Sequence, residues 1–204
     1  MIRSVTGIVL ISMICTLVIP ACGPHRNDQK EKAVAANEAK FKKRNPDVVS
    51  ATLERDARFA VDAIASGLME IKWSELAQKN GSEPRVKAFG NSMAAAQQTA
   101  NNELRRMAAS KQITLPDTAV AGARYQQLKS LTGDRFDKDY IKTMIRSQRQ
   151  NIEVFNRYIS AGKDSDLLRW AILKLPALKQ HLGYARGVDS ILERQRINGV
   201  PSLP

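Results

Sequence analysis

A run of apolar residues at helical spacing, between Gly133 and His181, constrains the fold of this chain more than any other feature. Residues three or four positions apart lie on one face of an α-helix, and an apolar face is stable only when it is buried. Gln148 lies in the middle of this face and is polar. The pattern therefore predicts a long amphipathic helix that carries one buried amide. The apolar members of the face are Phe136, Tyr140, Met144, Ile152, Phe155 and Ile159.

Three further segments show the same helical pattern, over residues 51–79, 84–111 and 165–196. Pro84 is favourable in the first turn of a helix, whereas Pro176 lies inside the last segment and is predicted to kink it. Aromatic residues make up only 5% of the chain, which disfavours a β-sandwich. The expected fold is therefore all-α: four long helices packed as one bundle.

The connection between the second and third long helices is predicted to contain one short helix. Residues 113–117 have an extended pattern, and Asp117 is a candidate N-cap for a helix that ends near Leu131. Thr132 or Asp134 is then expected to cap the long helix that follows.

The first 21 residues are typical of a secretory signal peptide, with Arg3 before an apolar stretch that is too short to span a bilayer comfortably. The following Ile19-Pro20-Ala21-Cys22 resembles a bacterial lipobox, from which Pro20 departs. We therefore expect lipid attachment at Cys22. Gly23 rather than aspartate follows this cysteine, which favours the outer membrane, with the protein facing the periplasm; a soluble periplasmic protein is the alternative.

The chain has two cysteines, Cys15 in the predicted signal peptide and Cys22 at the predicted lipidation site. The mature domain would then have no free thiol. This excludes cysteine nucleophiles, thiolate metal sites and redox switching as functions of the domain.

Residues 22–50 are polar and basic and are expected to form a flexible linker, with a short helix possible near residues 31–43. The formal net charge of +12 favours anionic surroundings such as envelope polymers. Nucleic acid is not an expected partner, because no basic motif interleaved with aromatic residues is present. The folded domain is placed at 51–196 and a tail at 197–204. A basic cluster in the linker comprises Lys40, Lys42, Lys43 and Arg44.

Each of the four predicted long helices carries one polar residue on its apolar or small face. In a four-helix bundle such residues can converge in the core and bind two metal ions. Their spacing within each helix allows all four to point inward, although the sequence does not place them at one height. These residues are Glu70, Gln97, Gln148 and His181.

Several short motifs resemble one bacterial family. They are Gly67-Leu68-Met69-Glu70, the run from Val86 to Met93, Leu115-Pro116, Phe136-Asp137 with Tyr140, and the run from Leu175 through Pro176 to His181. From about Ala51 to Arg194 the chain resembles the ferritin-like envelope proteins known as domain of unknown function 4142. The resemblance implies a ferritin-like helical bundle in a secreted or membrane-anchored protein of unassigned activity.

This chain departs from the family pattern at two positions of the polar layer. Gln97 and Gln148 stand where the family tends to have histidines. Glutamine is a poor ligand for transition metals, and Glu70 and His181 alone fall short of the usual three or four protein ligands. We therefore favour a buried hydrogen-bonded network over a working metal site.

Other candidate residues have structural interpretations. Asp137 is expected to cap or brace the start of its own helix, with Tyr140 hydrogen-bonded nearby. Trp73 and Trp170 are expected to pack in the core or in a groove, and His25 lies in the predicted linker.

The sequence contains no glycine-rich phosphate loop, no Gly-x-Ser-x-Gly turn and no His-Glu-x-x-His run. The expected function is therefore a non-catalytic structural or interaction module, held at the membrane by a lipid. One alternative is an iron- or manganese-binding protein that uses Glu70 and His181. Another is a binder of anionic envelope polymers through a basic face.

Overall fold

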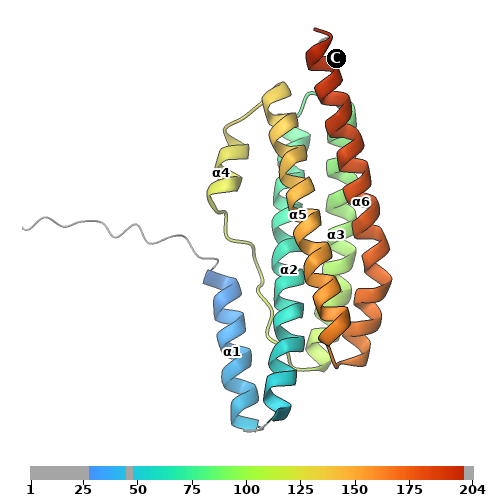
Figure 1. Cartoon of the computed structure of the whole chain (residues 1–204). Coiled ribbons are helices and arrows are strands. Elements are labelled where there is room, and N and C mark those ends of the chain that lie inside the picture. Colours follow the sequence, from blue (N-terminus) through green and yellow to red (C-terminus); the bar gives the residue numbers. More distant parts are fainter. Residues whose placement is uncertain (1–27, 45–47, 200–204) are drawn as a thin grey trace, which may run out of the picture.

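The computed structural model describes residues 28–44 and 48–199 (Figure 1). In these residues the chain is all-α, as predicted, and contains no strand. None of the helices described is both long and apolar enough to cross a membrane. The helices are α1 (Asp28–Arg44), α2 (Val48–Asn80), α3 (Pro84–Ser110), α4 (Ala123–Lys129), α5 (Gly133–Ala161) and α6 (Ser165–Ile197).

The four long helices α2, α3, α5 and α6 form the bundle (Figure 1). Helices α2 and α3 are antiparallel neighbours, and α5 and α6 form a second antiparallel pair. Between the two pairs, the chain returns along the bundle through an extended segment and α4 (Figure 1). Helix α5 also packs on α2, whereas α6 lies only loosely against α3. The seam between α3 and α6 is therefore the most open one in the bundle.

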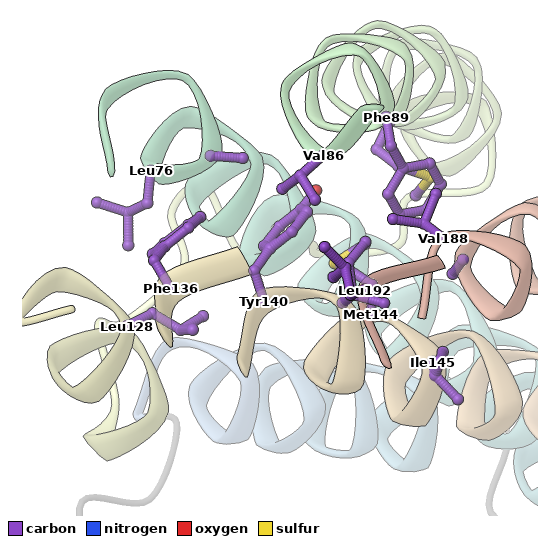
Figure 2. Close-up of a cluster of buried hydrophobic side chains, with 14 of the residues drawn as sticks. Leu76, Val86, Phe89, Leu128, Phe136, Tyr140, Met144, Ile145, Val188 and Leu192 are labelled. Atoms are coloured by element: carbon purple, nitrogen blue, oxygen red, sulfur yellow. The ribbon is translucent and has the colours of Figure 1, made fainter. Parts of the chain in front are cut away.

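The buried apolar side chains form two clusters, one toward each end of the bundle. The first cluster gathers around Phe136, Tyr140 and Met144 of α5, which face Val86 and Phe89 of α3 (Figure 2). Tyr140 is fully buried and pairs its hydroxyl with that of Ser74, at 3.1 Å. The second cluster is built around an aromatic group of Phe59, Phe155, Tyr158 and Trp170.

Asp137 does not cap or brace its own helix as predicted, because it braces the turn before a different helix. Its carboxylate accepts hydrogen bonds from the backbone N–H and the hydroxyl of Ser82, at 3.1 and 2.6 Å, and from the backbone N–H of Glu83, at 2.8 Å. These donors precede α3, so Asp137 holds the turn between α2 and α3 rather than the start of α5. The sequence pattern could not show that the start of α5 lies beside this turn.

Asp56 of α2 performs the same task at the opposite end of the bundle. Its carboxylate accepts hydrogen bonds from the backbone N–H groups of Lys163 and Asp164, each at 3.1 Å, in the turn between α5 and α6. Each helical hairpin therefore has its turn held by a buried carboxylate from the other hairpin. Sequence reasoning did not single out Asp56.

We predict that Asp137→Ala lowers the free energy of unfolding by about 2 kcal/mol, because three donors at the buried start of α3 lose their acceptor. Urea denaturation of the full chain measures this. Asp134→Ala is the matched control, since Asp134 is exposed and accepts the Ser82 hydroxyl of the same turn. Equal losses in the two variants would contradict the role of Asp137 in holding this turn.

The short helix considered near residues 31–43 is present, but residues 28–44 are docked on the fold, whereas a flexible linker was expected. They form a helix of 17 residues in which Ala33 and Phe41 are buried. The Asn37 side chain donates to the carbonyl of Thr114 at 2.9 Å and accepts from its N–H at 2.8 Å. Lys40 of the basic cluster donates to the same segment, at the carbonyl of Gln112 (2.7 Å). Helix α1 is thus docked on the fold.

The local predictions for the helix ends and for Pro176 have different outcomes. The short helix begins after Gly122, and Asp117 is exposed and pairs with Arg105, so the prediction of Asp117 as its cap is wrong. Thr132 occupies the N-cap position of α5, but its side chain makes no capping hydrogen bond. Helix α6 is continuous through Pro176, and the kink expected at this proline stays a prediction.

Several predictions concern residues outside the described part of the chain and therefore stay predictions. They concern the signal peptide at 1–21, Cys15, Pro20, the lipidation site Cys22, His25 and the last residues of the tail, 200–204.

Candidate functional site

The four polar residues singled out from the sequence lie at one level of the bundle. On each long helix, the buried apolar residues before the polar residue belong to one cluster, and those after it belong to the other cluster. The layer therefore separates the two clusters. Its members are Glu70 on α2, Gln97 on α3, Gln148 on α5 and His181 on α6.

Glu70 is the centre of this layer and is fully buried. One carboxylate oxygen, Oε2, accepts from Gln97 Nε2 at 2.5 Å. The other, Oε1, accepts from three donors of α5. These are Ser147 Oγ at 2.6 Å, Gln148 Nε2 at 2.9 Å and Asn151 Nδ2 at 2.9 Å.

All four donors to Glu70 are uncharged side chains, so no cation compensates the carboxylate at these contacts. Burial therefore raises the pKa of Glu70 to about 7, although the hydrogen bonds from Ser147, Gln148, Gln97 and Asn151 act in the opposite direction. Near neutral pH this carboxyl group is poised between its charged and neutral forms.

Sequence reasoning missed Ser147 and Asn151. They lie one residue before and three residues after Gln148, so a helix places all three toward the same neighbour. Ser66 of α2 orients the Asn151 amide by donating to its Oδ1 at 2.8 Å. A short polar patch on the apolar face of α5 was the signal that could have identified them.

His181 is at the level of the layer but is not among the donors to Glu70. Its ring is partly buried, and its Nδ1 is a buried atom without a hydrogen-bond partner. Burial lowers the pKa of His181, which keeps the imidazole neutral near pH 7. The structure thus brings together Glu70, Gln97 and Gln148 and leaves His181 beside them.

The polar layer provides few ligands for a metal ion. Across residues 28–44 and 48–199, no three or more His, Cys, Asp or Glu side chains gather in a way that could hold one. The amide nitrogens of Gln97 and Gln148 donate hydrogen bonds to both oxygens of Glu70, so these contacts hold the carboxylate without a metal ion.

The two tryptophans both pack against apolar clusters, as expected for core or groove residues. Trp170 belongs to the second cluster and donates its indole N–H to Glu103 at 2.8 Å. Trp73 packs against the first cluster.

The chain matches the model of one known protein family over most of its length. The family model described as Domain of unknown function (DUF4142) matches residues 42–188, from the end of α1 into α6. This chain belongs to the DUF4142 family. The resemblance inferred from the sequence motifs is thereby confirmed. No curated protein matches the chain.

Two solved structures from another family of unknown function share the fold of this DUF4142 chain. One is a DUF305 fragment from Deinococcus radiodurans, with 12% identity, a TM-score of 0.59 and coverage of 69% of this chain and 96% of its own. The other is a DUF305 protein from Streptomyces coelicolor, described as a candidate secreted protein, with 14% identity, a TM-score of 0.59 and coverage of 74% and 96%. At these identities the likeness concerns the fold alone.

Proposed function

We propose that this DUF4142 protein is a non-catalytic, lipid-anchored module of the bacterial envelope, with a ferritin-like bundle whose polar layer serves as a structural network instead of a metal centre. The observation that carries this proposal is the set of four neutral donors on Glu70. Two of them, Gln97 and Gln148, occupy positions where the family tends to have histidines. Amides at these positions satisfy the carboxylate and replace the ligands that a metal ion would need.

The helix arrangement supports the ferritin-like part of the proposal. Two antiparallel helix pairs are joined by one long crossover between α3 and α5, the connection typical of ferritin-like bundles. The crossover passes α1 and is held there by the hydrogen bonds between Asn37 and Thr114.

The proposed anchor at Cys22 would keep the bundle close to the membrane. Cys22 precedes the first residue of α1, Asp28, by six positions (28 − 22 = 6). Six residues reach at most about 20 Å when fully extended. We therefore place the bundle against the periplasmic face of the outer membrane. The name of the Streptomyces coelicolor protein agrees with export.

Metal analysis tests the proposal. We predict that the full chain, purified without a histidine tag, exposed to iron, manganese and zinc and then desalted, retains well under one metal ion per chain. Elemental mass spectrometry gives the ratio of metal to protein.

Near-stoichiometric iron or manganese that disappears in both Glu70→Ala and His181→Ala would overturn the proposal in favour of the metal-binding alternative. Glu75→Ala serves as the control, because Glu75 is an exposed carboxylate on the same helix. Metal lost equally from this control would indicate surface binding and would leave the polar layer without a metal.

A further inference from the structure

The open seam between α3 and α6 contains a cavity of about 260 Å³ directly beside the polar layer. Its lining includes the polar side chains of Gln97, Asn101 and His181. It also includes Phe155 and Trp170, whose rings lie 5.6 Å apart between centroids. The cavity therefore combines aromatic walls with a few convergent polar groups, as small-molecule sites do.

Asn101 and His181 line the cavity, and each has one polar atom without a partner among the described residues. Asn101 is only 5% exposed, and its Nδ2 is a buried donor without an acceptor. Gly67 of α2 makes room for this side chain, since a Cβ there would lie 2.4 Å from Asn101 Oδ1. The second group is His181 Nδ1, which is also buried and unpaired. Buried polar groups are normally satisfied, so both atoms lack a partner that such groups usually have.

The charged group on the cavity wall already has a partner. Lys174 Nζ lies 2.7 Å from Glu103 Oε2, and the same carboxylate oxygen accepts the Trp170 indole N–H. A ligand carboxylate would have to compete with Glu103 for this cation, and inside the layer it would approach Glu70. The electrostatics therefore favour an uncharged ligand.

We propose that this cavity binds a small, uncharged aromatic molecule that carries a carboxamide. The carbonyl oxygen would accept from Asn101 Nδ2, and the amide N–H would donate to the lone pair of His181 Nδ1 in the neutral imidazole. The ring would lie against Phe155 and Trp170. A cavity of about 150 Å³ is known to hold benzene, so by proportion this one has room for about ten non-hydrogen atoms, the size of a single substituted ring.

Benzamide is the probe that matches this description, and the site is independent of the lipid anchor and of metal content. We predict that benzamide binds the full chain saturably in an NMR titration, with the largest shifts at the Asn101 side-chain amide and the Trp170 indole N–H. Benzoate, with the same ring and a negative charge, is expected to bind at least tenfold more weakly, since it must place that charge near Glu70.

Variants that fill the cavity provide the decisive comparison. Ala100→Leu on α3 and Ala177→Leu on α6 place a larger side chain in the cavity from opposite walls, and each should weaken benzamide binding at least tenfold. Ala95→Leu is the matched control, because Ala95 is exposed on α3 and does not line the cavity. It should bind benzamide as the unmodified chain does.

Asn101→Leu tests the polar contact separately from the volume. Leucine is similar in size to asparagine but has no hydrogen-bond donor. The substitution should therefore weaken benzamide binding about fivefold and leave the binding of toluene, which has no amide, unchanged. The proposal would be overturned if benzamide did not bind saturably, or if both cavity-filling variants bound benzamide as tightly as the unmodified chain. It would also be overturned if benzoate bound as tightly as benzamide.

Discussion

Replacing Glu70 with alanine is expected to lower the free energy of unfolding by about 4 kcal/mol. The substitution leaves four donors without their acceptor in the centre of the bundle, three of them on α5 and one on α3. Each buried donor left unpaired costs about 1 to 3 kcal/mol. The total stays below the simple sum, because Gln148 Oε1 has no partner and can accept from a neighbouring donor after rearrangement.

Urea or guanidinium denaturation of the full chain measures this change, with Glu75→Ala as the control. Glu75 is exposed on the same helix, so its loss should change the free energy of unfolding by less than about 0.5 kcal/mol. Glu70→Ala within about 1 kcal/mol of the unmodified chain would show that the four donors are satisfied in another way, and the network would not be what organises the core.

The long helices and their buried faces could be predicted from the sequence because they depend on local periodicity. The apolar positions of α5 illustrate this: Phe136, Tyr140, Met144 and Phe155 are all buried. The start of α3 was also predictable, because a proline in the first turn is a strong local signal.

The height of each polar residue in the bundle could not be predicted, because it depends on how the helices slide past one another. Glu70 and Gln148 are 78 positions apart, and only the packed bundle shows that they form a hydrogen bond. The same limit explains Asp137, whose partners Ser82 and Glu83 belong to the turn of another helix pair. Local rules assign a carboxylate near a helix start to its own helix.

In helix α1 the apolar periodicity is present in the sequence, but it covers few residues and is weaker than in the long helices. Ala33, Asn37 and Phe41 are spaced by four residues and form its buried face. Only two of these three are apolar, and the surrounding residues are charged, so the segment resembled a linker. Its docking depends on the crossover segment at Thr114, which is far away in the sequence.

The pH dependence of stability should identify Glu70 more specifically than its removal does. Its pKa is raised from 4.5 to about 7 by burial, so the folded protein holds this proton more tightly than the unfolded chain. The stabilisation is fully present below pH 4.5 and is lost as the pH rises through 7. Each pH unit in this window changes the free energy of unfolding by about 1.4 kcal/mol, or about 3 kcal/mol in all.

Glu70→Gln removes this titration while keeping the shape of the neutral carboxyl group. Denaturation from about pH 4 to about pH 8 should therefore show the unmodified chain losing about 3 kcal/mol relative to the variant. His181, whose pKa burial lowers, acts in the opposite direction because its stabilisation is lost as the pH falls. Asp137, whose pKa burial raises, acts in the same direction as Glu70. Both residues are present in each protein, so the difference between the two curves reports Glu70 alone. Parallel curves would mean that the pKa of Glu70 is not raised in the folded protein, because its four donors offset the effect of burial.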